Sequence, residues 1–255
     1  MSVDIFSRFH LDGKRALITG ASSGFGAHFA QLLSAAGAEV ILAARRADKL
    51  SQLQQSLLSQ GRKASLVSMD VSSRESVKTC FDQIGACEIV INNAGITVIR
   101  ALLDQSEDDW DSVIDTNLKG CWLVATEAAR HMRTAEKPGT IVNVASILGE
   151  RVAAGVAPYA ISKAAVIQAT KVMALELARY QIRVNALLPG YVVTDLNRDF
   201  LQSEAGEKLR SRIPTRRFGH ITDLDGPLLL LCSDAGTGMT GSCVTVDHGH
   251  LLSSL

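Results

Sequence analysis

Short apolar runs and amphipathic stretches alternate along the chain. Seven runs are apolar at consecutive positions, which predicts strands buried on both faces: Arg15–Thr19, Ala38–Ala44, Ala64–Met69, Glu88–Ile91, Thr140–Ala145, Arg183–Leu188 and Ser242–Val246. Between them, apolar residues recur at helical spacing, most regularly in a stretch from Phe25 that Gly37 ends, and in Ala47–Gln60, Trp110–Met132, Pro158–Arg179 and Asp223–Cys232. Ser72 or Ser73 is placed to cap a further helix. The alternation predicts one α/β domain over residues 1–255, a doubly wound parallel sheet with helices on both faces.

One segment departs from this pattern. Tyr191–Ile221 is rich in charged and turn residues and follows a strand end at Pro189-Gly190. Ligands of such sheets bind at the carboxyl ends of the strands, and insertions there often act as lids. We therefore expect residues 191–221 to cover the ligand. An ordinary surface loop is the alternative.

The composition narrows the class of function. Lys and Arg number 26 against 26 Asp and Glu, a net charge of +0, so nothing favours binding to nucleic acid or to an anionic membrane. No apolar run reaches the roughly 18 residues of a spanning helix. Met1–Lys14 lacks the apolar core of a signal peptide, so the cytoplasm is the expected location.

The cysteines point to no special chemistry. They are five in number and contain no C-x-x-C pair, which disfavours a disulfide framework and a zinc site. We expect free, buried thiols at Cys80, Cys87, Cys121, Cys232 and Cys243.

A cluster of glycines follows the first predicted strand. Gly20, Gly24 and Gly26 lie where a strand ends and a helix begins, and there a glycine-rich turn lets backbone N–H groups approach a phosphate. The first gap is longer than in G-x-G-x-x-G, and a plain turn would also explain the cluster. If the turn binds phosphate, Ser22, Ser23 and Phe25 belong to the same site.

The end of the second strand bears on the kind of dinucleotide. An acidic residue about 20 positions after the glycines would hold the ribose 2′-hydroxyl of NAD. The sequence there reads Ala44-Arg45-Arg46 instead. No carboxylate repels a 2′-phosphate, and guanidinium groups suit one. The pattern favours NADP(H), with NAD(H) as the alternative; arginines that are only solvated at the surface would give the same sequence.

The stretch Ser146–Lys163 combines groups that handle protons. Tyr159 and Lys163 are four residues apart, so they share one face of the helix that Pro158 opens. A nearby ammonium favours the phenolate of a tyrosine, whose ordinary pKa is about 10. Lowering that pKa to near neutrality needs roughly 3–4 kcal/mol, which Lys163 and an oxidised nicotinamide are expected to supply together. The loop of small residues before the helix could bring Ser146 to the same face.

Several motifs occur together in the order of one known family. They are Thr19-Gly20-x-x-x-Gly24-x-Gly26, Asp70, Asn92-Asn93-Ala94-Gly95, Asn117, Ser146, Tyr159-x-x-x-Lys163 and Pro189-Gly190. From about Lys14 to Gly249 the chain resembles the compact short-chain dehydrogenases/reductases, most closely their 3-oxoacyl-carrier-protein-reductase-like branch. The resemblance implies a single Rossmann domain whose seven-stranded parallel sheet has the order 3-2-1-4-5-6-7, usually in a homotetramer.

The resemblance also implies roles for individual residues. Ser146 would hydrogen-bond the substrate oxygen, and Tyr159 would be the general acid in reduction and the base in oxidation. Lys163 would hold the nicotinamide ribose and lower the pKa of Tyr159, while Asn117 would position a water that relays protons to solvent. The remaining implied contacts are Asp70 and Val71 at the adenine, Asn93, Ala94 and Gly95 at the ribose, and Pro189, Gly190, Val192 and Thr194 toward the nicotinamide.

Two positions depart from the family pattern. His248 precedes Gly249 where the family usually has paired glycines. His248 and His250 could suggest a metal pair, but no third ligand is identifiable, so we expect a substituted turn near a subunit contact and no metal. Ser23 stands where NADP-linked members often carry a basic residue, which would leave Arg45 and Arg46 to hold the phosphate alone.

The leading hypothesis is an NADP-dependent oxidoreductase that reversibly reduces a ketone or 3-oxo group to a secondary alcohol. An NAD-linked alcohol or steroid dehydrogenase is one alternative; a dinucleotide-sensing binding protein is another, although such proteins tend to lack the Tyr or the Lys. The substrate is expected to be a hydrophobic ketone, because the candidate lining around Ser146 and Tyr159 is apolar and has no carboxylate-binding group: Ile96, Leu148, Ala153, Tyr191, Leu196 and Phe200. Ordinary core packing would give a similar set.

Overall fold

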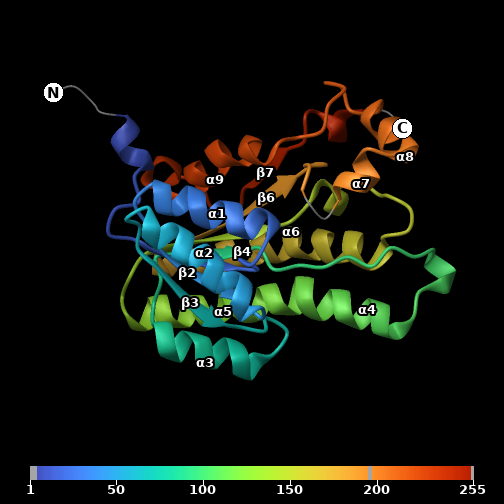
Figure 1. Ribbon diagram of the computed structural model, residues 1–255. Helices are drawn as coiled ribbons and strands as arrows, with labels where there is room; N and C mark the ends of the chain where they lie inside the picture. Colours follow the sequence, from blue (N-terminus) through green and yellow to red (C-terminus); the bar gives the residue numbers. More distant parts are fainter. Residues whose placement is uncertain (1–4, 195–196, 254–255) are drawn as a thin grey trace.

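Seven parallel strands form the centre of the part of the chain that the computed structural model describes, residues 5–194 and 197–253 (Figure 1). Their spatial order is β3-β2-β1-β4-β5-β6-β7, which confirms the expected α/β fold. The strands are β1 Arg15–Thr19, β2 Glu39–Ala44, β3 Ala64–Ser68, β4 Ile89–Asn92, β5 Gly139–Val144, β6 Ile182–Pro189 and β7 Cys243–Val246. Because every neighbouring pair is parallel, all carboxyl ends lie along one edge of the sheet.

Helices cover both faces of this sheet. The α-helices are α1 Gly24–Ala35, α2 Ala47–Ser59, α3 Arg74–Ile84, α4 Glu107–Ile114, α5 Gly120–Thr134, α6 Ala157–Leu177, α7 Arg198–Leu201, α8 Glu204–Arg210 and α9 Asp225–Cys232. A π-helical turn, η3 Asp115–Lys119, joins α4 to α5. The 3-10 turns are η1 Phe6–Phe9, η2 Leu102–Asp104, η4 Ile147–Gly149, η5 Ala178–Tyr180, η6 Ile221–Leu224, η7 Asp234–Gly236 and η8 His250–Leu252.

Two apolar layers hold the helices on the sheet. In β1, Ala16 and Ile18 pack with side chains of α1, α2 and α9, whereas Leu17 packs with those of α3, α5 and α6 on the other face. All three side chains are fully buried. Burial on both faces explains why the strands read as continuous apolar runs.

Several element ends differ from the sequence-based expectation. The long helix expected at Trp110–Met132 begins earlier, at Glu107, because Ser106 and Asp109 form a capping box there. The π turn then interrupts it, and such turns often lie at functional positions. The helix expected at Asp223–Cys232 begins with the 3-10 turn η6, and α9 starts only at Asp225.

Within the insertion Tyr191–Ile221, residues 197–221 form a small lobe that carries α7 and α8, at the upper right of Figure 1. Its neck is closed by backbone hydrogen bonds from Val193 N to the Gly219 carbonyl at 3.0 Å and from Gly219 N to the Tyr191 carbonyl at 2.9 Å. Leu201 and Ile213 are buried within the lobe. Its action as a lid stays a prediction.

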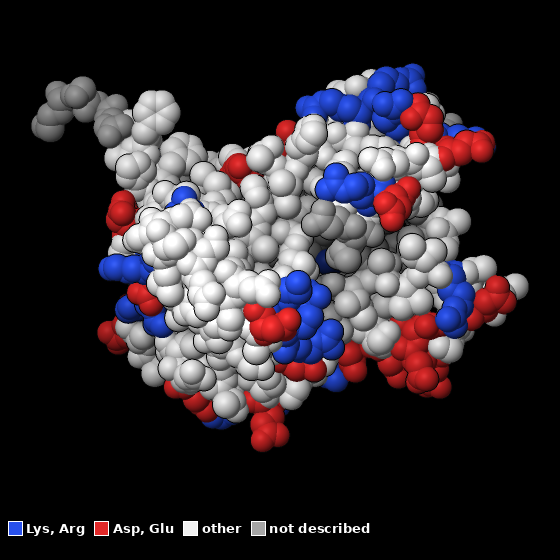
Figure 2. Space-filling view, viewed as in Figure 1, with Lys and Arg blue, Asp and Glu red and all other residues white. Residues whose placement is uncertain are grey.

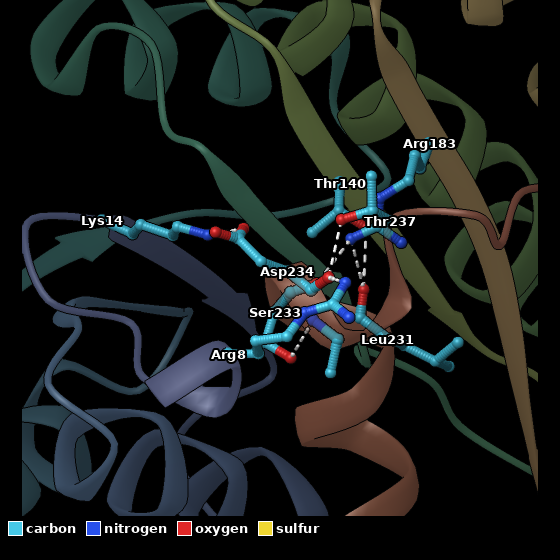
Figure 3. A network of polar contacts seen from close by, with 9 residues as sticks. Arg8, Lys14, Thr140, Arg183, Leu231, Ser233, Asp234 and Thr237 are labelled. Atoms are coloured by element: carbon cyan, nitrogen blue, oxygen red, sulfur yellow. Dashed lines mark hydrogen bonds and ion pairs between the residues drawn. The ribbon is translucent and has the colours of Figure 1, made fainter. Parts of the chain in front are cut away.

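At the amino edge of the sheet, a polar network ties β6 to the segment after α9 (Figure 3). Arg183 Nη2 donates to the carbonyls of Leu231 at 2.9 Å and Ser233 at 3.3 Å, and its Nη1 donates to the carbonyl of Met239 at 3.2 Å. Lys14 pairs with Asp234 at 2.6 Å. The network fixes the last quarter of the chain against the strands that precede it.

The expected free thiols are confirmed: Cys80, Cys87 and Cys232 are buried, and Cys121 and Cys243 are half-buried. Across residues 5–194 and 197–253, no helix is long and apolar enough to span a bilayer. The same ranges contain no group of three or more His, Cys, Asp or Glu side chains arranged to hold a metal ion.

Candidate active site

The glycine-rich turn joins β1 to α1. Gly20 and Gly24 have left-handed φ values of +67° and +54°, which glycine adopts without steric cost. A Cβ on Gly26 would lie 2.3 Å from the carbonyl oxygen of Gly20, so only glycine fits there. At its glycine positions the turn has no side chains that could cover the first N–H groups of α1. The turn and these N–H groups therefore form a cradle that suits a phosphate.

Arginines border this turn. Arg46 Nη2 donates to the hydroxyl of Ser22 at 2.8 Å and to that of Ser23 at 3.0 Å. Arg45 follows β2 beside it, and both arginines are exposed. Arg46 thus brings to the turn the positive charge that Ser23 lacks, which the sequence did not reveal.

The end of β3 carries Asp70 and Val71. The Asp70 Oδ1 accepts hydrogen bonds from the Ser72 hydroxyl at 2.7 Å and from Ser72 N at 3.0 Å. The Ser72 hydroxyl is the main reason that the pKa of Asp70 is lowered, and the nearby charge of Arg45 adds to the effect. Asp70 is therefore an anionic hydrogen-bond acceptor at neutral pH, as an adenine amino group would require.

Thr19 fastens the end of β4 to the glycine-rich turn. Its Oγ1 accepts hydrogen bonds from Asn93 N at 3.0 Å and Ala94 N at 3.1 Å, and Asn93 Nδ2 donates to the Thr19 carbonyl at 2.9 Å. The segment predicted to line the ribose is thus held directly against the phosphate cradle.

The three proton-handling groups, Ser146, Tyr159 and Lys163, lie close together where the carboxyl end of β5 meets the first turns of α6. Lys163 Nζ lies 5.5 Å from the ring centre of Tyr159 and donates to the Val144 carbonyl at 2.7 Å. Ser146 follows β5, and its hydroxyl lies near enough to the phenol of Tyr159 to influence its pKa. The sequence predicted this cluster from spacing alone, and the geometry brings it together.

Burial sets the protonation of the cluster. It raises the pKa of Tyr159, and the nearby Ser146 hydroxyl opposes this rise only in part. Burial also lowers the pKa of Lys163 to about 8. Among the protein groups alone, lost hydration raises the pKa of the phenol, and its lowering by Lys163 together with an oxidised nicotinamide stays a prediction. At neutral pH the phenol keeps its proton.

Asn117 projects from the π turn into the same region. Its Oδ1 accepts from Ile96 N at 2.8 Å, and its Nδ2 donates to the Ile96 carbonyl at 2.9 Å and to the Ser162 hydroxyl at 3.1 Å. A Cβ on Gly95 would lie 3.3 Å from Asn117 Oδ1 and 3.6 Å from Lys163 Nζ. The amide thus clamps the segment after β4 to α6, and a water held by Asn117 stays a prediction.

The residues expected toward the nicotinamide lie at the end of β6 and in the neck of the insertion. Pro189 closes β6, and a Cβ on Gly190 would lie 2.8 Å from the Cα of Asp247. Val192 forms a parallel bridge with Gly219. Thr194 N donates to the Asn197 side chain at 2.8 Å, which fixes the chain just before the lobe.

A cavity of about 200 Å³ adjoins the cluster. Its lining comes from the loop after β5, from the insertion and from the C-terminal turn: Leu148, Arg151, Val152, Ala153, Ala154, Tyr191, Leu209, Arg212 and His250. Leu148 N donates to the Ser146 hydroxyl at 3.1 Å, and Tyr191 lies close enough to Tyr159 to raise its pKa. Through Leu148 and Tyr191, the cavity therefore lies next to the proton-handling groups.

This lining only partly matches the predicted pocket. Leu148, Ala153 and Tyr191 line it, whereas Phe200 is half exposed to solvent and Ile96 is held at Asn117. Leu196 lies outside the described residues. The sequence-based list omitted three polar side chains, Arg151, Arg212 and His250, although both arginines fall in segments already predicted to flank the substrate.

The two C-terminal histidines have different neighbours. His248 Nε2 pairs with Asp223 Oδ2 at 3.0 Å, whereas His250 is buried with its ring 5.6 Å from that of Tyr191. His248 and Gly249 have left-handed φ values of +57° and +81°. Glycine adopts such φ values readily, which explains why paired glycines suit this turn. In this chain, the pairing with Asp223 holds His248 in the turn.

Comparison with protein families and curated sequences gives consistent matches. A family model described as enoyl-(acyl carrier protein) reductase matches residues 20–250. A gluconate 5-dehydrogenase of Gluconobacter oxydans is 36% identical over 246 residues, which cover 94% of this chain and 96% of that protein. A 3-oxoacyl-[acyl-carrier-protein] reductase of Chlamydia pneumoniae is 37% identical over 243 residues, 94% of this chain and 97% of the reductase.

Solved structures share the whole fold. A gluconate 5-dehydrogenase from Burkholderia cenocepacia, crystallised with NADP and tartrate, superposes with a TM-score of 0.93 at 36% identity and covers 98% of this chain and 99% of its own. Since matches of this extent leave almost no part of the chain unaccounted for, it is a member of the short-chain dehydrogenase/reductase family of NAD(P)-dependent oxidoreductases.

Proposed function

We propose that the protein catalyses the reversible, NADP(H)-dependent reduction of a ketone to a secondary alcohol. One observation carries the proposal: a half-buried phenol that keeps its proton, Tyr159, near the Ser146 hydroxyl and one helical turn from the ammonium of Lys163, whose Nζ lies 5.5 Å from the phenol ring centre. A phenol in this state is a general acid. Relatives named for the interconversion of carbonyl and hydroxyl groups support the same chemistry.

The proton is handled by the chain's own residues. In reduction, the Tyr159 hydroxyl donates its proton to the carbonyl oxygen of the substrate, and the Ser146 hydroxyl donates a hydrogen bond to the same oxygen. Lys163, charged below a pKa of about 8, stabilises the phenolate that remains. In alcohol oxidation the phenolate accepts the proton. The nicotinamide supplies or accepts the hydride when it is bound.

The residues at the carboxyl edge fit a phosphorylated dinucleotide. The cradle at Gly20, Gly24 and Gly26 suits the pyrophosphate, and Asp70 presents an anionic acceptor for the adenine. Arg45 and Arg46 would pair with the 2′-phosphate, because guanidinium groups bind phosphate with two parallel hydrogen bonds. Solved relatives with bound NADP support this choice over NAD.

The implied homotetramer also belongs to the proposal. A groove of about 530 Å³ runs between α5 and α6, and its lining includes Trp122 and Val172, which are 42% and 47% exposed. Leu175 on α6 is 82% exposed. Exposed apolar side chains on two neighbouring helices are typical of an interface between subunits.

The replacement Tyr159→Phe tests the proposed function. Turnover of NADPH with a panel of aryl ketones, cyclic ketones and 3-oxoacyl thioesters should fall by about 10²- to 10⁴-fold, the usual contribution of a positioned general acid. Affinity for NADPH, measured by fluorescence titration, should change little. Tyr180→Phe is the matched control, since Tyr180 lies in the 3-10 turn η5 after α6, stacks with Arg179 and should leave turnover unchanged. Turnover near the wild-type value in Tyr159→Phe would refute the mechanism.

A further inference from the structure

The cavity beside Ser146 and Tyr159 carries positive charge that the proposed proton transfer does not use. Among the described residues that line it, Arg151 and Arg212 are cationic and none is acidic. Arg151 comes from the loop between η4 and α6, and Arg212 from the end of the helical part of the insertion. Two guanidinium groups thus face one small cavity from separate segments of the chain.

Arg151 is held in place by the C-terminal turn. Its Nη1 donates to the His250 carbonyl at 2.5 Å. Arg151 and Tyr191 both line the cavity; burial raises the pKa of Tyr191, and the nearby charge of Arg151 opposes this rise. A guanidinium has five N–H donors in a rigid plane. The bond to His250 orients that plane and leaves donors for a ligand.

His250 adds an independent indication that a polar partner belongs in this cavity. The side chain is only 2% exposed, and within the described part of the chain its Nδ1 has no hydrogen-bond partner. Burial lowers the pKa of His250, and the charges of Arg151 and Arg212 lower it further, so the ring is neutral at pH 7. A buried ring nitrogen without a partner is costly and calls for one.

The lobe above the cavity is also basic. Residues 197–221 contain six Lys and Arg against three Asp and Glu, a net charge of +3. Lys and Arg side chains lie beside fewer Asp and Glu side chains at the upper right of Figure 2, where Figure 1 places α7 and α8. Such a field raises the local concentration of anions and speeds their association.

We propose that the substrate of the reaction proposed above is a short keto acid, or the matching hydroxy acid, whose carboxylate is bound by Arg151 and Arg212 while its carbonyl lies at Ser146 and Tyr159. Guanidinium groups match the planar carboxylate, and the His250 ring can complete its hydrogen bonds. A cavity of about 200 Å³ is smaller than the usual ligand pocket of roughly 300–1,000 Å³, which favours a short chain. The proposal replaces the hydrophobic ketone expected from the sequence.

Matched pairs of ketones test the role of the carboxylate. The two probes are 4-oxopentanoate and 5-oxohexanoate, each compared with its uncharged primary amide at saturating NADPH. The wild-type enzyme should prefer the acid over its amide by at least tenfold in kcat/KM for one of the two lengths. In Arg212→Gln this preference should fall by about tenfold to a hundredfold, the usual loss for a hydrogen bond to a charged group.

Lys208→Gln is the matched control. It removes the same charge from the same lobe, but Lys208 is exposed on α8, pairs with Glu204 at 2.7 Å and does not line the cavity. The preference for the acid should stay within twofold of the wild type. A fall of the same size in both variants would show that the general charge of the lobe attracts the acid, which would overturn a specific site.

A binding measurement separates this proposal from the proposed function. Calorimetric titration of the NADP-saturated enzyme with 4-oxopentanoate should show binding that Arg212→Gln weakens and Lys208→Gln does not. If such binding occurs without reduction of any ketone, the anion site stands and the proposed function fails. If amides are reduced as well as acids and Arg212→Gln leaves their ratio unchanged, the proposed function stands and the anion site is refuted. Absence of both binding and preference also refutes it.

Discussion

Two cations withdrawn from water lie at opposite edges of the sheet, Arg183 at the amino edge and Lys163 at the carboxyl edge. Arg183 donates to three backbone carbonyls, those of Leu231, Ser233 and Met239. Within the described residues, Lys163 donates a hydrogen bond to a single carbonyl, that of Val144. Burial lowers both pKa values, that of Lys163 to about 8, but only Arg183 is surrounded by acceptors.

We propose that this difference separates a cation that supports structure, Arg183, from one that supports chemistry, Lys163. The guanidinium of Arg183 uses its fixed plane to join β6 to the chain after α9, and its bonds compensate for lost hydration. The ammonium of Lys163 has three N–H donors and uses one of them in the hydrogen bond to the Val144 carbonyl. The remaining donors can bind a ribose hydroxyl or a water. The burial of Lys163, although energetically costly, would therefore serve the proposed function.

Lys163→Met should have the largest effect, and on turnover alone. Loss of the ammonium removes the group that stabilises the phenolate of Tyr159, so NADPH turnover should fall by about 10²- to 10⁴-fold. The free energy of unfolding at pH 7 should stay unchanged or rise by up to about 2 kcal/mol, because methionine has a similar length and no charge to bury. Urea denaturation measures the second quantity, and a clear loss of stability would contradict the comparison.

The pH dependence of stability sharpens the same contrast. Below pH 8, Lys163 is protonated in the folded and the unfolded chain, and burial of its charge is a constant cost. Between about 8 and the ordinary value of 10.5, the folded protein has released the proton and the unfolded chain has not. Stability relative to Lys163→Met should therefore rise over this range, by at most about 3 kcal/mol. A flat difference would show that Lys163 is not buried as a cation.

Arg183→Met should act in the opposite sense. It leaves the carbonyls of Leu231, Ser233 and Met239 without this donor, so unfolding should become easier by about 2–4 kcal/mol. The kcat of the folded fraction should change less than twofold. Lys78→Met, which removes an exposed partner of Asp82 on α3, should shift stability by less than about 1 kcal/mol. Equal effects of the two substitutions would mean that the amino-edge network contributes nothing beyond a surface ion pair.

The sheet could be predicted well from the sequence, because strands buried on both faces consist of continuous apolar runs. Tyr159 and Lys163 could be predicted for a similar reason, since a spacing of four on a helix fixes their common face. Helix ends such as Glu107 depend on a capping box that competes with periodicity. The π turn at Asp115–Lys119 has no counterpart in a periodicity of 3.6 residues.

Long-range contacts could not be predicted from spacing. Arg151, Arg212 and His250 reach one cavity from three segments, and no pattern within any one segment reveals that meeting. The shift that the protein groups alone cause in the pKa of Tyr159 could not be predicted, because proximity to Lys163 follows from the sequence, whereas loss of hydration depends on the packing around it. The reach of Arg46 back to Ser22 and Ser23 likewise depends on how β2 pairs with β1.

Arg46→Ala extends the comparison to a cation at the surface and should have the smallest effect. Arg46 is exposed and donates to Ser22 and Ser23, so its loss should barely change stability. The KM for NADPH should rise by about tenfold. This factor is smaller than the loss expected for a buried charged pair, because solvent screens the charge of Arg46. The KM for NADH should change less than twofold, since NADH has no 2′-phosphate.

Lys49→Ala, on the exposed start of α2, controls for loss of charge near the turn and should affect both coenzymes equally. If Arg46→Ala raised the two KM values alike, Arg46 would support the glycine-rich turn rather than select the phosphate.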